Sequence, residues 1–251
     1  HTRYPLVTGV QTCALPIYTD PVARMLDRFV EAGALHPQHT SSPFTAADVT
    51  VVIPVFGTAP TPPTGVRTVM VDDASTPPVD APPNCSVLRR ETNGGPAAAR
   101  NTGLAAVDTP LVAFIDADVA VDDGWLEPLL AHFSDPRVAL VAPRVASAEA
   151  PGLIGAYEHR HSPLDLGPEP ARIAAGTRVS YVPAATLVCR TDVIRSLGGF
   201  DESMRVGEDV DLVWRLVDAG HRARYEPASV VDRKSTRLNS SHEWIFRMPS
   251  S

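Results

Sequence analysis

The chain has 251 residues, of which 44% are apolar and 20% are charged, and its formal net charge is −7 at pH 7. This size and apolar content predict one folded domain with a sizeable core, and the mild acidity argues against the basic surface typical of nucleic-acid binding. The longest apolar runs stay below eighteen residues, so no segment of the sequence is expected to span a membrane.

The two ends of the chain are related to each other at the level of codons. Residues 7–17 (VTGVQTCALPI) and 232–242 (DRKSTRLNSSH) can be encoded by reverse-complementary codons at every position, beginning with GTG for Val7 and CAC for His242. A protein has no physical reason to carry such an inverted repeat, whereas a sequencing adapter translated at both ends of a DNA contig would produce it. We therefore interpret residues 1–17 and 232–251 as non-native and set them aside, with a native amphipathic terminus as the alternative.

The remaining cysteines are Cys85 and Cys189, because Cys13 lies in the first of these terminal segments. They are far apart in sequence, form no CxxC pair and follow no secretory signal, which is typical of reduced thiols. We expect a cytoplasmic protein, with association of a longer protein with the inner face of the membrane as a further possibility.

Patterns of apolar residues predict the elements in chain order. Residues 21–33 begin with proline, end with glycine and have helical apolar spacing, which predicts an amphipathic helix followed by a linker over 36–47. The next elements are strands at 49–55, 66–71, 85–89, 111–115 and 138–143, with helices at 95–106 and 124–132. After a proline-braced loop at 161–170 we expect a strand at 179–189, helices at 191–197 and 208–219, and a strand at 223–231. Strands that alternate with helices predict a parallel sheet, which binds its ligands beyond the carboxyl ends of its strands.

Asp116 and Asp118 flank one alanine directly after an apolar strand. Residues two apart on a strand face the same way, so both carboxylates are expected to point into one space. A hard divalent cation, Mg²⁺ or Mn²⁺, would stabilise the pair and leave coordination sites open for phosphate oxygens. The alternative is a polar turn at the end of a strand.

Asp72 and Asp73 end an earlier strand in VMVDDAS, at the same predicted edge of the sheet. A carboxylate at this place can accept the ring N–H of a pyrimidine base. The alternative is an Asx turn followed by a serine cap.

Residues 93–101 (NGGPAAARN) combine two glycines with the start of a helix. Backbone N–H groups at a helix N-terminus suit a phosphate or a ribose, and Arg100, inside the helix, can neutralise one of the aspartates. The stretch has neither the G-x-G-x-x-G pattern nor the lysine of a phosphate-binding loop, which argues against dinucleotide-binding and ATPase functions.

Gly207, Glu208 and Asp209 begin an amphipathic helix. Acidic residues in a first helical turn commonly complement the helix dipole. The functional alternative is a general base directed into the cleft.

These motifs occur together in one order, and in that order they resemble the inverting family 2 glycosyltransferases. The resemblance rests on IPVFG, VDDAS, NGGPAAARNTGL, FIDADV, LGGFDE and GEDVDLVWRL. Finer features, AGALHP, YEHRHSPLDLGPEPA and RVSYVPAATLVCR, resemble the mycofactocin-system members of that family. The implied fold is α/β, a GT-A (Rossmann-like) mostly parallel sheet flanked by helices and truncated at its C-terminus. It would occupy residues 48–231, preceded by an N-terminal helix and linker over 18–47.

The resemblance also implies roles for individual residues. The nucleotide would bind at Pro54, Val55, Asp72, Asp73, Asn93, Gly94, Arg100 and Asp116. A Mg²⁺ or Mn²⁺ ion would be held by Asp118 with Asp116, and Asp209 would be the base, with Glu208 as the second candidate. Donor and acceptor sugars would lie along Pro183, Ala184, Ala185, Gly199, Phe200 and Asp201.

The implied reaction transfers a sugar from a UDP-sugar, expected to be UDP-glucose, to an acceptor hydroxyl with inversion. The implied acceptor is a peptide-derived redox cofactor, and neither a nucleic acid nor a membrane span is expected.

The sequence departs from the family in two places. A short proline-rich segment, GTAPTPPTGVR, replaces the helix that usually follows the first strand. The metal-binding histidine of the family would follow the strand at 223–231, where the non-native segment begins, and His242 is not a substitute for it. We therefore expect this chain to bind UDP and metal weakly and to turn over little substrate.

Two other functions remain as alternatives. A sugar-nucleotide pyrophosphorylase uses a similar sheet but needs basic residues after the first strand, where FGTAPTPPTG has none. A non-catalytic module that binds nucleotide sugars is the second alternative.

Overall fold

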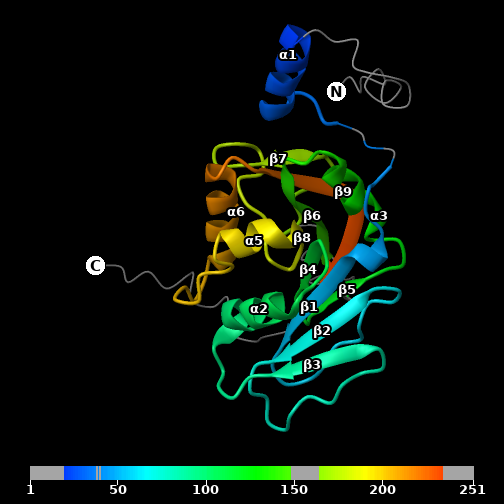
Figure 1. The fold of residues 1–251 in the computed structure, drawn as a ribbon, viewed down its shortest axis with the longest axis vertical. Helices are drawn as coiled ribbons and strands as arrows, with labels where there is room; N and C mark the ends of the chain where they lie inside the picture. The colour runs from blue at the N-terminus through cyan, green and yellow to red at the C-terminus, as the bar shows by residue number, and fades with distance from the viewer. Residues whose placement is uncertain (1–19, 38, 40, 148–163, 234–251) are drawn as a thin grey trace, which may run out of the picture.

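The computed structural model describes residues 20–37, 39, 41–147 and 164–233 (Figure 1). Most of the two terminal segments and part of the loop predicted at 161–170 lie outside the described residues. The helices are α1 (Asp20–Glu31), α2 (Gly95–Ala106), α3 (Glu127–Ala131), α5 (Thr191–Ser196) and α6 (Glu208–Asp218), with 3-10 turns at Ala46–Asp48 and His132–Ser134. The strands are β1 (Val49–Val55), β2 (Arg67–Asp72), β3 (Cys85–Arg89), β4 (Leu111–Ile115), β5 (Val119–Val121), β6 (Val138–Ser147), β7 (Ala171–Ile173), β8 (Thr186–Arg190) and β9 (Arg222–Arg233).

The described strands form one mixed sheet in the order β3-β2-β1-β4-β8-β6-β9-β5, with β7 paired to β9. The half made by β3, β2, β1 and β4 is parallel, as the alternation of strands and helices predicts. In the other half, β8 runs antiparallel to both β4 and β6, while β6 and β9 are parallel. No helix is assigned between β1 and β2 in the described segment 56–66, so the proline-rich stretch alone makes that crossover.

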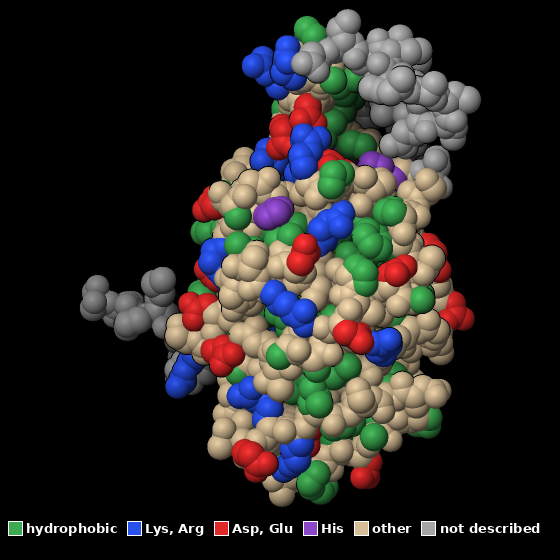
Figure 2. All heavy atoms as spheres, viewed as in Figure 1, with side chains coloured by type: hydrophobic (Ala, Val, Ile, Leu, Met, Phe, Trp, Pro, Cys, Tyr) green, Lys and Arg blue, Asp and Glu red, His purple; other side chains and the backbone are tan. Residues whose placement is uncertain are grey.

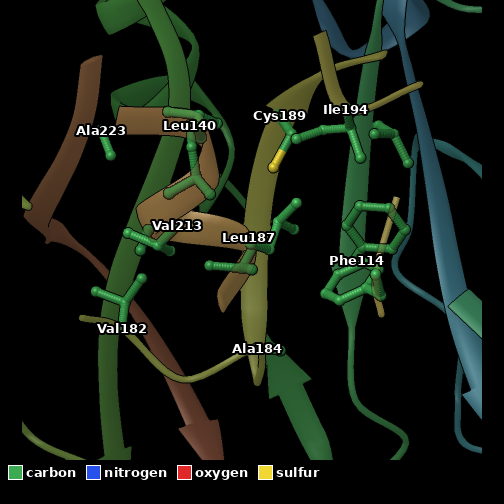
Figure 3. Close-up of a cluster of buried hydrophobic side chains, with 14 of the residues drawn as sticks. Phe114, Leu140, Val182, Ala184, Leu187, Cys189, Ile194, Val213 and Ala223 are labelled. Carbon is green, nitrogen blue, oxygen red and sulfur yellow. The ribbon is translucent and has the colours of Figure 1, made fainter. Parts of the chain in front are cut away.

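Alternate residues of the central strands enter two cores, one on each face of the sheet. On β1, Val52 packs in the core covered by α2, α5 and α6, whereas Val51 and Ile53 pack in the core covered by α3. Figure 3 shows the first core, where Phe114, Leu187, Ile194 and Val213 come from four different elements. Burial on both faces explains why these strands are nearly continuous runs of apolar residues.

Three predicted elements differ clearly from the structure. The strand predicted at 138–143 is longer, because β6 stays paired with β9 as far as Ser147. The helix predicted at 124–132 is shorter, because Gly124 has a φ of +82° and cannot continue a right-handed helix, so α3 starts only at Glu127. The strand predicted at 179–189 is continuous only from Thr186; before it, Val179 makes an isolated bridge to Ile173 of β7, and the Ala184 N–H donates to Asp209. The short strands β5 and β7 have no counterpart among the predicted elements.

Helix α1 contacts the first residues of β9 through charged side chains. Arg222, which is only 6% exposed, donates to Asp27 and also pairs with Glu31 and Asp135. Arg137 donates to both oxygens of the Asp27 carboxylate. Acidic and basic side chains meet where α1 approaches the body of the molecule, and over the rest of this face the two signs are interspersed (Figure 2).

Among the described residues, no helix has both the length and the apolar character needed to cross a bilayer.

We predict that Gly103→Ala lowers the free energy of unfolding by about 1–3 kcal/mol through overpacking. A Cβ at Gly103 would lie 2.3 Å from Val52 Cγ1 and 3.1 Å from Val71 Cγ2, and both valines are fully buried. Urea denaturation followed by circular dichroism measures the change. Ala105→Ser, on the exposed side of the same helix, is the control and should change stability by less than about 0.5 kcal/mol. Equal stability of the two variants would contradict the packing of α2 against β1 and β2.

Candidate functional site

The candidate site lies at one rim of the sheet. The parallel strands β1, β2 and β4 end there at Val55, Asp72 and Ile115. Because β8 is antiparallel to β4, with Ile115 opposite Thr186, the residues that precede β8 reach the same rim. Ligands of open α/β sheets bind outside the carboxyl ends of the strands, so the topology places the predicted motifs where such a ligand would bind.

Asp72 stabilises the turn that follows β2. Its carboxylate is 1% exposed and accepts hydrogen bonds from the backbone N–H groups of Ser75 (2.9 Å) and Val79 (3.1 Å) and from the Arg89 guanidinium. Burial alone would raise the pKa of Asp72, but these hydrogen bonds outweigh it and lower the pKa to about 2. The geometry matches the Asx-turn alternative, and the nucleotide contact of Asp72 stays a prediction.

Asp73 connects β2 to the glycine-rich loop. The Gly95 N–H donates to Asp73 Oδ2 at 2.8 Å, the Gly94 N–H donates to Oδ1 at 3.0 Å, and Arg90 Nε donates to Oδ1 at 2.8 Å. The N–H groups predicted to suit a phosphate or a ribose are therefore bonded to a carboxylate of the protein itself. Asn93 is exposed and its side chain accepts from the Gly95 N–H at 3.2 Å.

Asp116 and Glu208 share one arginine. Arg100, from α2, donates through Nη2 to Asp116 Oδ1 at 2.5 Å and through Nη1 to Glu208 Oε1 at 3.0 Å. Its side chain is 3% exposed. Burial favours the neutral form of Arg100, but the two facing carboxylates outweigh burial and raise its pKa, so the side chain is a permanent cation.

Asp118 is paired with Arg233, whose Nε donates to Oδ2 at 2.9 Å. The stretch from Asp116 to Asp118 forms a turn between β4 and β5, in which the Val119 N–H donates to the Asp116 carbonyl. Because the strand ends at Ile115, the strand argument for both carboxylates facing the same way does not apply, and the backbone matches the alternative of a polar turn after the strand. Arg233 belongs to the segment interpreted as non-native.

Residues 184–185 connect the D-A-D turn to α6. The Ala184 N–H donates to Asp209 Oδ2 at 3.1 Å, and the Ala185 carbonyl accepts from the Asp116 N–H at 3.0 Å. Helix α6 begins at Glu208 after Gly207, whose φ of +86° reverses the chain. Among the described residues Asp209 makes no ion pair, in contrast to Glu208.

The other predicted site residues differ in exposure. Phe200 is 2% exposed and Val55 is 1% exposed, so their side chains belong to the core, while the Val55 carbonyl accepts from the Asp73 N–H at 2.9 Å. Pro54 and Pro183 are half-buried. Asp201 is exposed and accepts from Ser203. These residues lie on the segments that form or adjoin the rim, and their ligand contacts stay predictions.

The donor set fits a hard cation only in part. Asp116 and Asp118 each supply carboxylate oxygens, the ligands that Mg²⁺ and Mn²⁺ prefer, and Mg²⁺ commonly takes its remaining ligands from phosphate and water. Over the described parts of the chain, however, no three His, Cys, Asp or Glu side chains are placed to hold a metal. The two carboxylates therefore have the right chemistry for such an ion, but each is already paired with an arginine, Asp116 with Arg100 and Asp118 with Arg233.

Arg89 and Arg90 were not predicted as part of the site. Arg89 ends β3 opposite Asp72 in the strand register, and Arg90 follows it directly. Arg90 also donates to the Ala98 carbonyl and to Thr102 Oγ1, and so fixes the first turn of α2 against Asp73. An acidic pair and a basic pair at the ends of consecutive strands are the sequence signal that could have identified them.

This rim brings together carboxylates from three segments: Asp72 and Asp73 at the end of β2, Asp116 after β4, and Glu208 and Asp209 in the first turn of α6. The family model described as Glycosyl transferase family 2 matches residues 62–193. The chain belongs to this family.

Relatives and solved structures agree with this assignment. The pre-mycofactocin glycosyltransferase of Mycobacterium tuberculosis (strain ATCC 25618 / H37Rv) is 49% identical over 243 residues, which cover 91% of this chain and 51% of the relative. The succinoglycan biosynthesis protein ExoU of Rhizobium meliloti is 30% identical over 204 residues, covering 73% of this chain and 58% of ExoU. This chain thus spans about half the length of the curated relatives that it matches.

Two solved structures share the fold. TarS 1–349 of S. aureus in complex with UDP-GlcNAc has a TM-score of 0.58 at 18% identity, covering 76% of this chain and 59% of TarS. GalNAc-T7 with UDP, GalNAc and Mn²⁺ has a TM-score of 0.56 at 16% identity, covering 76% of this chain and 44% of GalNAc-T7. The architecture is therefore that of the GT-A glycosyltransferases.

The contacts of Asp72 predict how stability depends on pH. Its pKa in the folded protein, about 2, is below its usual value of 3.8, so its contribution is complete above about pH 4 and is lost as the pH falls toward 2. The stability difference between wild type and Asp72→Asn should shrink by about 2 kcal/mol over that window. Urea unfolding at several pH values measures it, with the exposed Asp80→Asn as the control. A difference that stays constant with pH would contradict the assignment.

Proposed function

We propose that this chain is the nucleotide-sugar-binding part of an inverting glycosyltransferase that moves glucose from UDP-glucose to a hydroxyl of a peptide-derived redox cofactor, in mycofactocin glycosylation. The observation that carries the proposal is the convergence of Asp116, Glu208 and Asp209 around residues 184–185 and Arg100. The 49% identical relative named as a pre-mycofactocin glycosyltransferase supports the acceptor class. We place this chemistry in the domain at 48–231, in the cytoplasm.

In this proposal, Asp209 accepts the proton of the acceptor hydroxyl. The hydroxyl oxygen attacks the anomeric carbon from the face opposite the diphosphate, the bond to the diphosphate breaks, and UDP leaves with the bonding electrons. Asp209 suits this role because it begins α6 at the rim and the Ala184 N–H orients its carboxylate. A Mg²⁺ or Mn²⁺ ion bound at Asp116 and Asp118 would act as a Lewis acid on the departing diphosphate.

The nucleotide would bind over the glycine-rich loop and the end of β1. Asp73 and Arg90 fix that loop, and Pro54 and Val55 form the end of the strand beside it. The sugars would lie along residues 183–185 and 199–201. Membership of the glycosyltransferase family favours transfer over the pyrophosphorylase alternative.

We predict that Asp209→Asn lowers the rate of sugar transfer by about 10²–10⁴-fold, because the amide cannot accept the proton. The assay is UDP release from UDP-glucose with acceptor, in a version that restores the region after residue 231. The dissociation constant for UDP, measured by calorimetry, should stay within about twofold of wild type, since Asp209 is not part of the nucleotide loops. Asp211→Asn, in the same helical turn, is the matched control. Unchanged transfer in Asp209→Asn would show that Asp209 is not the base, whereas UDP binding without transfer in wild type would favour a binding module over an enzyme.

We also predict that Arg233→Ser strengthens the binding of UDP with Mn²⁺ to this chain several-fold, about 3–10-fold. The guanidinium of Arg233 occupies Asp118 Oδ2, so a divalent ion has to compete with it. Calorimetric titration of UDP in the presence of MnCl₂ measures the effect. Arg67→Ser removes an arginine at the opposite end of β2 and should leave the affinity unchanged. Weaker binding in Arg233→Ser would show that this arginine contributes to the nucleotide site.

A further inference from the structure

Arg100 is a buried cation that holds two segments more than ninety residues apart in the sequence. It projects from the middle of α2, and its Nη1 and Nη2 groups donate to Glu208 and Asp116 respectively. The side chain of Glu208 is 12% exposed and that of Asp116 is 24% exposed, so water screens these charges poorly. Removing one partner of such a buried ion pair strongly destabilises the folded protein, because the other charge stays buried without compensation.

The guanidinium of Arg100 also packs against an aromatic ring. Its Cζ lies 5.2 Å from the centre of the Phe200 ring, and that ring packs edge-on against Phe114 at 5.0 Å. The next residue of α2, Asn101, accepts from the Phe200 N–H at 2.9 Å and donates to the Phe200 carbonyl at 2.8 Å. Two adjacent residues of α2 therefore hold both α6 and the loop that leads to it.

We propose that Arg100 is a positioning residue, and that its bridge between Asp116 and Glu208 fixes the first turn of α6, and with it Asp209, relative to the D-A-D turn. The inference rests on the proposed function for its consequence in catalysis. In this proposal, Glu208 holds the first turn of α6 to Arg100, and Asp209 accepts the proton.

The donors of Arg100 support a positioning role over direct contact with the nucleotide. Each terminal nitrogen donates one hydrogen bond to a carboxylate, and Nε is buried with no hydrogen-bond partner among the described residues. The Arg100 side chain is 3% exposed, so its remaining N–H groups have little access to a phosphate or a ribose. Glu208 Oε1 is likewise occupied, whereas the only contacts of Asp209 within the described chain are with backbone N–H groups.

The test is hydrogen exchange of the amides in the first turn of α6, where the Asp211 N–H donates to the Gly207 carbonyl at 3.0 Å. Arg100→Gln leaves two facing carboxylates without a cation, so these amides should exchange about tenfold faster, while those of β4 change less than about threefold. Arg100→Lys should give an intermediate rate, because one ammonium group cannot reproduce the two-pronged fork. Arg195→Gln removes another arginine bound to α2, through the Leu104 and Val107 carbonyls, and should leave the first turn of α6 unchanged.

A second-site variant separates charge balance from simple loss of packing. Adding Glu208→Gln to Arg100→Gln removes the unpaired carboxylate on α6 and leaves only that of Asp116, so it should bring the exchange of the α6 amides back to within about threefold of the Glu208→Gln single variant. Exchange in Arg100→Gln that stays at the wild-type rate would overturn the proposal, as would the absence of rescue. If Arg100→Gln does not fold, Arg100→Lys decides by the same local comparison.

The effect of UDP on hydrogen exchange distinguishes a positioning role from a purely structural one, because an arginine with only a structural role would not change that effect. UDP with MnCl₂ should slow the exchange of the α6 amides in wild type about threefold or more, and this coupling should be lost in Arg100→Lys while UDP affinity changes less than about threefold. Lost UDP affinity with unchanged α6 exchange would identify Arg100 as a nucleotide ligand and overturn the proposal. If wild type fails to bind UDP, the proposed function fails, and the exchange rates measured without nucleotide still decide the positioning role.

Discussion

The rim of this protein depends on one buried guanidinium with two carboxylate partners. A charge that is removed from water costs several kcal/mol unless it is paired and hydrogen-bonded, and Arg100 meets that condition only while α2, the D-A-D turn and α6 keep their present arrangement. The three elements come from separate parts of the chain, so the ion pairs act as a constraint on tertiary structure. Residues 184–185 add a second connection, made of backbone hydrogen bonds, between the same turn and the same helix.

The pairing also leaves the rim with an excess of negative charge. Arg100 balances one of the two carboxylates that it contacts, Asp209 has no cationic partner among the described residues, and Asp118 is balanced by Arg233 alone. If Arg233 is non-native, the native rim has one positive charge fewer. In the proposed function, a rim of this sign repels a free diphosphate, and a divalent cation bound with the diphosphate offsets that repulsion.

Local sequence patterns predicted the strands of the parallel half of the sheet well, because strands that are buried on both faces consist almost entirely of apolar residues. The boundaries of β1, β3, β4 and α2 agree with the sequence-based expectation residue for residue, since turn residues punctuate those runs. The direction of β8 was not predictable, because it depends on pairing with β4, more than seventy residues earlier. The carboxylates were predicted together with Arg100 as the partner of one aspartate, but Arg90 and Arg233 were not, because they reach the carboxylates only through tertiary contacts.

Asp73 shows why residue type alone underdetermines a binding role. An ionised carboxylate has about four acceptor sites, and Arg90 Nε with the N–H groups of Gly94 and Gly95 already directs its donors to them. A further donor at Asp73 therefore has to share an oxygen with one of these groups or displace it. Displacing the Gly94 or Gly95 N–H would remove a contact that holds the N-terminus of α2, and α2 carries Arg100. The glycine-rich loop and the first turn of α6 are thus connected through a single helix.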